Sequence, residues 1–512
     1  MKRTFSIYLT CWLVCPATLT TMLGQVASVT IGNGPAQPDG SYLNATDIAG
    51  TLAFTYVGVT STNKIDIADN IDLANTALFG PTYFDLSLNT VTINLLHDIL
   101  LGNGGLLLNA QTVNLNGKVT TTNGTLLSES SIAGTATNVN VLSAAASLQQ
   151  AIDFASTTNL VTIQVSPGQY QGNLTIDKLA TLRLTNGVTV LASNAIYLGF
   201  TSNSTSRRIV NSGSSLVVSN AAGTGVFDIR RGTNQFNSGL INVDQLVMTN
   251  TAGVFEFNGG VLKTRGTTSA NGSPFVVGNG SFSASFELPG NSTHSFANGL
   301  QIASNALLSG DGTVIGNVTL ANGGTLSPGA SMGRLTVNGN LILTSGSTNV
   351  FELDKGSGTN DNITGLASVT LGGTLMVTNL SGTLTNGDTF KLFSAAAYGG
   401  AFSSFSATAP GPGLKWNLHR LPVDGVLQVL SATSAPPVIG SITLLDGTNL
   451  VISASEGTPY DPVYLLTATN VNLPMMDWVY LATNNFDVAG NVNLTNAIVT
   501  GEPEHYFRLQ VQ

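Results

Sequence analysis

Short runs in which apolar residues alternate with Thr, Asn or Ser recur over most of the 512-residue chain. Residues 85–89 read DLSLN and residues 112–116 read TVNLN, so every second side chain is apolar. Alternation with period two is typical of strands that have one buried and one solvated face. Gly102, Gly105 and Gly117 fall between such runs and predict turns. The chain is therefore predicted to be all-β, with short strands and turns repeating along it.

Scarcity of charge narrows the class further, because only 9% of residues are charged and the net charge is −9. Low charge is typical of membrane proteins or fibrous repeats. After the N-terminal segment, however, no apolar run approaches the roughly 20 residues that cross a bilayer. Val, Ile, Leu and Phe recur too often for a disordered chain. The sequence also has no basic footprint for nucleic acid, so we predict neither that partner nor a transmembrane segment.

The first residues have the layout of a cleavable signal peptide. Lys2 and Arg3 precede an apolar stretch and then a region of small residues, which predicts a signal over residues 1–27 and a secreted or cell-surface protein. Cys11 and Cys15 lie inside it, so the mature chain is predicted to have no disulfide. A lipoprotein anchored at Cys15 is the alternative, although Val14 is large for the residue before a lipidated cysteine.

One predicted helix interrupts the strands. Over residues 147–155 the apolar Leu148, Ala151 and Ile152 fall on one face at helical spacing. A strand, the turn sequence SPGQY at 166–170 and the strand sequence LTIDK at 174–178 follow. This order resembles the opening of right-handed parallel β-helices of the pectate-lyase-like superfamily. The resemblance implies a β-solenoid whose open end is covered by a capping helix.

Two later segments carry a second resemblance. Residues 306–344 read ALLSGDGTVIGNVTLANGGTLSPGASMGRLTVNGNLILT, and residues 369–405 read VTLGGTLMVTNLSGTLTNGDTFKLFSAAAYGGAFSSF. They look like the autotransporter-associated β-strand repeat of large bacterial exported proteins and the tail that follows it. This resemblance implies a passenger-type solenoid and says nothing of a ligand.

The domain organisation follows from these segments. Residues 28–141 form a β-rich N-terminal region, either the first coils of the solenoid or a separate β-domain. Residues 142–434 form the β-solenoid, and residues 435–437 are a Pro-containing linker. Residues 438–512 are predicted to be a small antiparallel β-sandwich. They resemble a C-terminal module of secreted proteins from environmental bacteria, and surface sorting or attachment is our hypothesis for it.

Chemistry-bearing residues are scattered. His97, His294, His419 and His505 have no metal-ligand spacing and are expected in turns or solvent. Acids such as Asp153, Asp177 and Asp228 stand singly, so we predict no catalytic residue, metal or cofactor.

The densest acidic group is Asp66, Asp69 and Asp72. On a helix the three would share a face suited to Ca²⁺, whereas on a strand Asp69 would point away from the other two. We favour a solvated, turn-rich edge.

Two arginine pairs are the candidate binding residues. Arg207-Arg208 and Arg230-Arg231 lie 23 residues apart, close to one turn of a β-helix. If the turns stack in register, the pairs lie about 4.8 Å apart, and the like charges repel unless an anion joins them. Guanidinium groups suit carboxylates, which predicts an acidic glycan as ligand. The alternative is that turn lengths vary and the arginines splay into solvent.

The sequence thus predicts a non-catalytic extracellular or cell-surface β-solenoid. Its expected role is structural or adhesive, with weak multivalent contacts to polysaccharide or cell-surface glycans. The alternative is a β-helix polysaccharide lyase or glycoside hydrolase whose site is assembled across turns.

Overall fold

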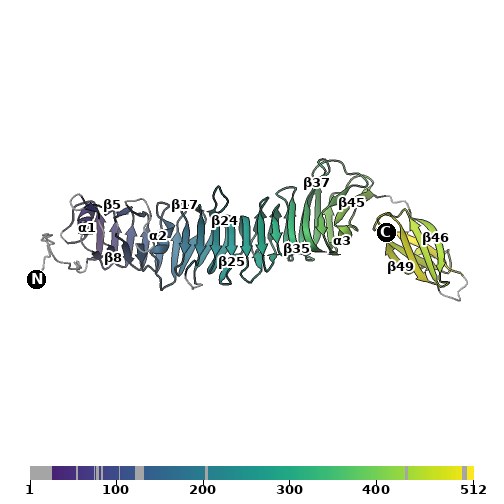
Figure 1. The fold of residues 1–512 in the computed structure, drawn as a ribbon, viewed down its shortest axis with the longest axis horizontal. Helices are drawn as coiled ribbons and strands as arrows, with labels where there is room; N and C mark the ends of the chain where they lie inside the picture. The colour runs from purple at the N-terminus through teal and green to yellow at the C-terminus, as the bar shows by residue number, and fades with distance from the viewer. Residues whose placement is uncertain are drawn as a thin grey trace. The chain divides into compact units, whose positions relative to one another are not determined.

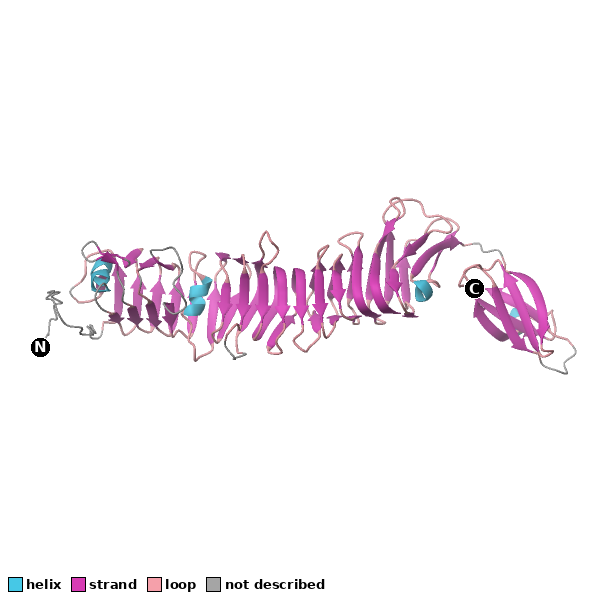
Figure 2. Cartoon of the chain, in the orientation of Figure 1, coloured by secondary structure: helices cyan, strands magenta, loops and turns pink. Residues whose placement is uncertain are grey.

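The computed structural model describes residues 26–37, 39–52, 56–73, 75–76, 80–81, 85–102, 104–121, 132–201, 206–432, 436–498 and 504–511. Strands make up 56% of the structure and helices 5%, which confirms the all-β prediction. Figure 2 shows this predominance of strands. The signal-like segment up to residue 25, with Cys11 and Cys15, lies outside the described residues, as does Ala435 of the predicted linker.

The chain divides into two compact units. Unit 1 comprises the residues up to Ala330 with Arg334–Asn349, and unit 2 comprises Ser331–Gly333 with the residues from Val350 onward. The strands of unit 1 pair in parallel in three ladders, and Figure 1 shows strands of this unit side by side. The first ladder contains β1 (Ser28–Gly32), β4 (Lys64–Ile67), β9 (Thr92–Leu95), β12 (Thr112–Leu115), β15 (Asn138–Val141), β16 (Val161–Val165), β19 (Ala180–Leu184), β22 (Arg208–Val218), β24 (Gly232–Met248), β25 (Gly253–Phe257), β27 (Phe275–Val277), β30 (Leu300–Ile302), β33 (Val318–Leu320) and β35 (Arg334–Leu343).

The other two ladders are built in the same way, and the long strands β22, β24, β26 and β35 bend from one ladder into another. The second ladder contains β5 (Ile71–Leu73), β10 (Ile99–Leu101) and β13 (Val119–Thr121), then β17 (Gly168–Gln171), β20 (Val188–Ala192), β22, β24, β26 (Gly260–Ser269), β28 (Ala284–Leu288), β31 (Ala306–Gly310), β34 (Thr325–Pro328) and the start of β36 (Thr348–Asp354). The third contains β3 (Val57–Thr60), β8 (Leu86–Asn89), β11 (Leu106–Asn109) and β14 (Ile132–Gly134), then β18 (Leu174–Ile176), β21 (Ala195–Leu198), β23 (Val226–Ile229), β24, β26, β29 (Thr293–Phe296), β32 (Thr313–Ile315) and β35.

Each turn of chain repeats the alternation seen in the sequence. In β12 the side chains of Val113 and Leu115 are buried, while Thr112 and Asn114 lie on the outside. Turn length varies, because partners in the first ladder are separated by as few as 18 residues (Leu300 and Val318) and as many as 36 (Ser28 and Lys64). β15 pairs with β12 on one side and β16 on the other, so residues 28–141 continue into the following turns through the first ladder.

Helix α1 (Ala45–Leu52) covers the first strands of the second and third ladders, β5 and β3. Its buried residues, Ala45, Ile48, Ala49 and Leu52, form one stripe at helical spacing. Asn44 starts the helix, since its Oδ1 accepts hydrogen bonds from the amides of Thr46 (2.8 Å) and Asp47 (3.3 Å). Burial of Leu52 alone contributes on the order of 2 kcal/mol. The helix at the N-terminal end of the ladders is therefore α1, which the sequence analysis did not predict.

Helix α2 (Leu148–Asp153) is the predicted helix, but its expected position at an open end is wrong. It lies between strands that pair on both of its sides, and its glutamines satisfy strand backbone on two turns. Gln150 donates to Val119 O (2.6 Å) and accepts from Val119 N (2.9 Å). Gln149 accepts from Thr175 N (2.8 Å) and donates to Thr175 O (3.3 Å). The side-chain amides of Gln149 and Gln150 take the place of neighbouring strands. Helix α2 therefore protects strand edges in the interior of the ladders and not at their end.

Unit 2 contains both parallel and antiparallel strands. Its parallel pairs join β38 (Asn362–Leu371) to β41 (Phe393–Ala395) and β42 (Tyr398–Gly400), and β39 (Thr374–Asn379) to β43 (Ser404–Ala407). Its first antiparallel sheet contains β40 (Thr389–Lys391), β45 (Val426–Ser431) and β44 (Leu414–Asn417), near helix α3 (Leu421–Asp424). A short antiparallel pair in unit 2 joins β36 to β37 (Thr359–Asn360). In unit 1, β6 (Asn75–Thr76) and β7 (Gly80–Pro81) form another, and β2 (Tyr42–Asn44) pairs in parallel with β1.

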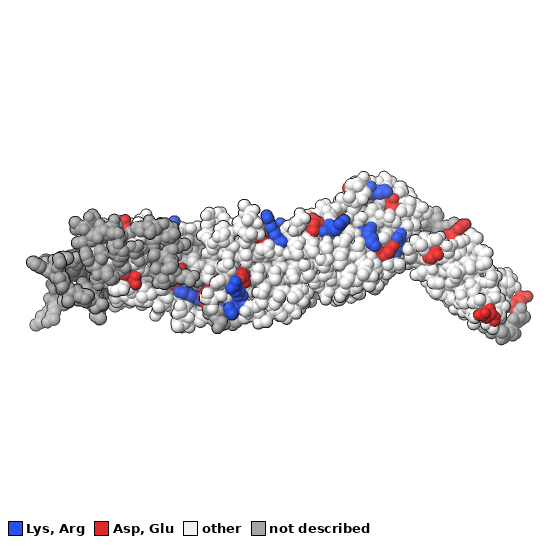
Figure 3. Space-filling view, viewed as in Figure 1, with Lys and Arg blue, Asp and Glu red and all other residues white. Residues whose placement is uncertain are grey.

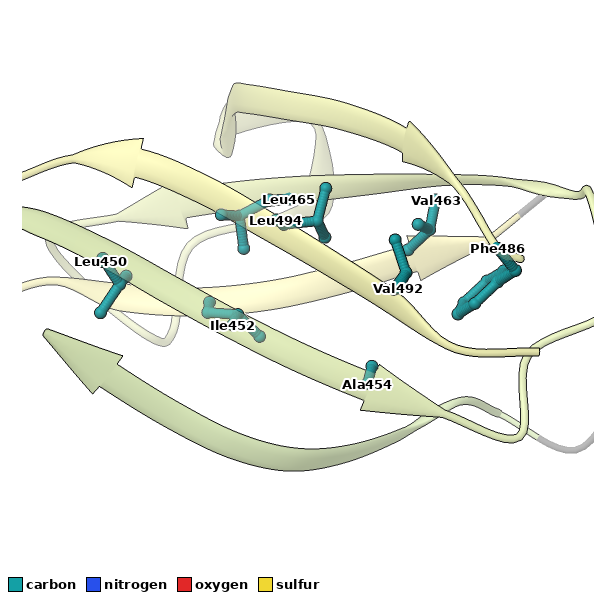
Figure 4. Packing of buried hydrophobic residues seen from close by; sticks show 8 residues of the cluster. All are labelled: Leu450, Ile452, Ala454, Val463, Leu465, Phe486, Val492 and Leu494. Carbon is teal, nitrogen blue, oxygen red and sulfur yellow. The ribbon is translucent and has the colours of Figure 1, made fainter. Parts of the chain in front are cut away.

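The C-terminal residues form two antiparallel sheets that share one apolar core. One sheet contains β46 (Val438–Leu445), β47 (Asn449–Ser455) and β50 (Val492–Ala497); the other contains β49 (Val479–Asn485), β48 (Pro462–Ala468) and β51 (Tyr506–Val511), with the 3₁₀ helix η1 (Met475–Asp477) before β49. Leu494 and Val492 from the first sheet lie beside Leu465 and Val463 from the second, as Figure 4 shows. No helix among the described residues has the length and hydropathy needed to cross a bilayer.

Loss of the Gln150 amide is expected to open the strand edge at Val119. Gln150→Ala leaves a buried N–H and a buried C=O without partners, at a cost of about 2–4 kcal/mol. Hydrogen exchange at the Val119 amide should accelerate and the midpoint of thermal unfolding should fall. Gln171→Ala, at an exposed position of β17, is the control and should leave both values unchanged. Unaltered exchange at Val119 in the Gln150 variant would contradict this role of α2.

Candidate functional site

Three of the four predicted arginines, Arg207, Arg230 and Arg231, lie beside Gly199 and Phe200 after β21, but the two pairs do not stack. Arg208 pairs with Thr233 along the first ladder, a separation of 25 residues, whereas the prediction needed 23. The amides of Arg230 and Arg231 instead bond to Leu198 O, at 3.0 and 3.1 Å. The register therefore removes the predicted stacking of one pair on the other, although Arg207 and Arg231 still approach each other beside Gly199.

Arg207 is a structural residue, since only 1% of its surface is exposed. Its Nη2 donates to the carbonyl oxygen of Asp177 at 2.8 Å. Burial lowers the pKa of Arg207; Asp177 opposes this shift and Arg231 adds to it. Arg207 and Arg231 both approach Gly199, where an added Cβ would lie 3.0 Å from Arg207 Nη1 and 2.7 Å from the Arg231 Cβ. A larger residue at 199 does not fit between them, and the backbone there has φ +75°.

Arg230 belongs to a small surface cluster with aromatic residues. Its Nε donates to Asp228 Oδ2 at 2.8 Å, and its guanidinium carbon lies 4.2 Å above the centre of the Phe200 ring. Phe200 and Tyr197 lie 4.7 Å apart, and Tyr197 is the ladder partner of Asp228. Stacking of this kind contributes about 0.5–1 kcal/mol at an exposed site. Arg230 is therefore already paired, which leaves Arg208 and Arg231 as the more available cations of the predicted four.

Several acids bond to backbone amides and hold turns. Asp244, 2% exposed, accepts from Ser219 Oγ, Asn220 N and Gly225 N, each at 3.0 Å. In unit 2, Asp361 accepts from Gly333 N at 2.8 Å and Glu352 N at 2.7 Å. Such carboxylates satisfy amides that the ladders leave open. The sequence analysis treated the acids as single residues and missed this role.

The acidic group Asp66, Asp69 and Asp72 is spread over two strands and the turn between them. Asp66 lies in β4 and Asp72 in β5, while Asp69 accepts from Asn33 N at 3.0 Å. Among the described residues, no three His, Cys, Asp or Glu side chains are grouped so that they could hold a metal ion.

One cavity in unit 2, of about 250 Å³, is lined by Lys415, Trp416, Asn417, Leu418, His419, Asp461 and Pro462. It is slightly smaller than the roughly 300–1,000 Å³ of typical ligand pockets. Its carboxylate, Asp461, already lies 3.5 Å from Lys415 Nζ and 3.6 Å from His419 Nε2.

The outer face of the sheet β49–β48–β51 carries a group of tyrosines with an arginine. Tyr464 is the cross-strand neighbour of Gln510, and Leu466 is the neighbour of both Tyr480 and Arg508. Tyr480 donates from its hydroxyl to Gln510 Oε1 at 3.3 Å. The alternation of Tyr506, Arg508 and Gln510 in the printed sequence was the available signal for this shared face.

No protein-family model, curated protein or solved structure matches this chain. The resemblances to autotransporter-associated repeats and to pectate-lyase-like β-helices therefore stay predictions.

His294 is buried, so its expected place in a turn or in solvent is wrong. Its exposed fraction is 0%. Its Nδ1 lies 3.0 Å from Thr267 Oγ1 and its Nε2 2.8 Å from Ser292 Oγ, which satisfies a neutral ring at both nitrogens. Burial lowers the pKa of His294 from 6.5 to about 4. The alternation His294–Phe296, which puts both on one strand face, was the missed signal.

Acid is expected to destabilise unit 1 through His294. Its pKa is lower in the folded than in the unfolded chain, so the unfolded chain binds more protons between pH 6.5 and about 4. The free energy of unfolding should be unaffected by His294 above pH 6.5 and should fall, by about 3 kcal/mol in total, as the pH decreases to 4. Denaturant unfolding at pH 7 and pH 4.5 measures this. His294→Gln should lose less stability on acidification than the parent, and the exposed-site control His97→Gln should match the parent. An equal loss in all three proteins would refute this origin of the acid sensitivity.

Proposed function

We propose that this chain is a non-catalytic extracellular or cell-surface β-solenoid with a structural and adhesive role. The observation that carries the proposal is the continuity of the first ladder from β1 to β35, with an apolar residue turned inward on each strand. A parallel strand–connection–strand unit is right-handed in about 98% of cases, which favours a right-handed parallel β-helix. The two antiparallel sheets at the C-terminus then form the predicted β-sandwich. The extracellular location rests on the signal-like residues 1–27.

Polar side chains on the outer faces of the ladders support a structural role. Asn140 donates to Asn114 Oδ1 at 2.8 Å, Asn114 donates to Asn94 Oδ1 at 2.7 Å, and Asn94 donates to Asp66 Oδ1 at 2.6 Å. A second stack joins Asn109 to Asn89 at 2.7 Å. Each Asn–Asn bond ties one turn to the next without adding charge, and the first stack ends on the Asp66 carboxylate, which is paired with Lys64. The repeating surface therefore stabilises the stack of which it is part.

The adhesive part of the proposal rests on surface chemistry. On the face drawn in Figure 3, charged side chains are separated by broad areas without charge. Such a surface supports many weak contacts, whose combined strength grows when a polymer engages several at once. Arg208 and Arg231 add cations that favour an acidic polysaccharide.

The experiment that tests this function measures both the binding and the cleavage of polysaccharides. A chain without residues 1–27 is incubated with plant and algal polysaccharides, and both retention and bond cleavage are followed. We expect retention on acidic polymers without new reducing ends or unsaturated products. The double variant Arg208→Gln/Arg231→Gln should be retained less, and Arg334→Gln, an exposed arginine of β35, is the control. Product that accumulates with time, and is lost in Asp228→Asn, would favour the alternative of a β-helix polysaccharide lyase or hydrolase.

A further inference from the structure

The outer face of the sheet β49–β48–β51 is here called the tyrosine face and is defined by Tyr464, Leu466, Tyr480, Tyr506, Arg508 and Gln510. Leu466 lies at its centre and is only 1% exposed, although it points away from the core between the two sheets. It is covered by Trp478 and by the partly buried Tyr464 and Tyr506. This face therefore has a packed apolar layer of its own.

Tyr480 is exposed yet held in place. Its exposed fraction is 59%, and its ring meets the Tyr464 ring edge to face, with centres 5.6 Å apart. Its hydroxyl reaches from β49 across β48 to Gln510 of β51. An aromatic ring fixed at both ends loses little further freedom when a ligand stacks on it. The face is thus prepared for contact with a flat apolar surface.

Arg508 supplies the charge on this face. It is exposed, is the cross-strand neighbour of Leu466, and forms no ion pair with any described residue. Beside it, Gln510 uses Oε1 for Tyr480, and its Nε2 donates to no described residue. Glu504, the acid near the end of the face, accepts a hydrogen bond from the Tyr506 hydroxyl at 3.0 Å. A ligand therefore meets an aromatic surface, a cation and a free amide donor together.

We propose that the tyrosine face binds an acidic polysaccharide, with a uronate ring stacked on Tyr480. The C–H face of a pyranose is apolar and packs on an aromatic ring, while its equatorial groups point outward to polar partners. The Arg508 guanidinium matches a planar carboxylate in a two-pronged contact, and Gln510 Nε2 donates to a ring hydroxyl. Charge complementarity on this face favours a carboxylate, since Arg508 forms no ion pair with a described residue, and the net charge of −9 makes this local cation the point at which an acidic polymer can approach. The inference deepens the proposed function and rests on it.

The test is titration of the chain from residue 28 onward with sodium polygalacturonate, with dextran as the neutral polymer. We expect Tyr480→Ala and Arg508→Gln each to weaken polygalacturonate binding by about tenfold or more. Binding by Arg508→Gln should also depend less on salt, because one ionic contact is lost. Tyr480→Phe keeps the ring and should bind within a few-fold of the parent. Ile442→Ala, at a 56% exposed apolar position of the other sheet, is the matched control.

The results distinguish binding at the tyrosine face from the adhesive function of the whole chain. Polygalacturonate binding that persists unchanged in both Tyr480→Ala and Arg508→Gln would overturn the assignment to this face and leave the adhesive function standing. Failure of the parent chain to bind any polymer would refute the adhesive function itself. A self-associated parent that becomes monomeric on Tyr480→Ala, with glycan binding unaltered, would mark the face as a protein contact and overturn the proposal. Near-ultraviolet circular dichroism shows whether the variants keep the folded C-terminal sheets, and Arg508→Gln removes only an exposed side chain.

Discussion

Hydrogen bonding between the backbones of successive turns is the constraint on which the rest of unit 1 depends. In a parallel ladder every strand needs a partner on both sides, because an unpaired buried N–H or C=O costs as much as a lost hydrogen bond. Where a strand is missing, another group takes its place: Gln150 bonds to Val119, and Gln149 bonds to Thr175. At the N-terminal end α1 packs over the first strands. Helices and buried carboxylates occur here as substitutes for strand partners.

The same constraint explains the unusual composition. Stacked turns bring identical positions close together, so a charge repeated from turn to turn would face its like. Asn avoids this, because its amide both donates and accepts, and Asn114 does so between Asn94 and Asn140. The structure places its charges instead in local pairs, such as Arg230 with Asp228 and Lys263 with Glu287. Low charge and an Asn-rich surface are therefore consequences of stacking.

Local features could be predicted from the sequence, whereas register could not. Alternation in segments such as residues 112–116 identified strands and their buried faces, since burial depends on neighbours one and two positions away. The expected stacking of the arginine pairs was wrong because turn length varies between 18 and 36 residues, so a spacing of 23 does not fix a partner. The residues of α2 were correctly predicted to be helical, but the position of the helix in the fold was not. Its own sequence does not show that strands pair on both sides of it.

In the candidate sites, too, features set by local alternation could be predicted, whereas contacts between strands could not. His294 and Phe296 lie two residues apart and therefore on the same face of β29. The burial of His294 could have been predicted from this alternation. Tyr506, Arg508 and Gln510 share a face for the same reason. The approach of Tyr480 to Gln510 could not be predicted, because it depends on which strands of the sheet are neighbours.

Helix α2 has a further consequence for cooperativity. In a stack of turns each turn is coupled mainly to its neighbours. Partial unfolding that starts at one end therefore tends to stop where the contact between two turns is weakest. At α2 the first ladder crosses through β15 and β16, while the third has the single bridge between Ala136 and Ala155. Gln150 bonds to the backbone of the turn before α2, and Gln149 bonds to the backbone of the turn after it. The backbone groups that face α2 on both sides therefore have hydrogen-bond partners even where no strand pairs with them. We therefore expect fraying from the N-terminal end to stop at α2, within unit 1.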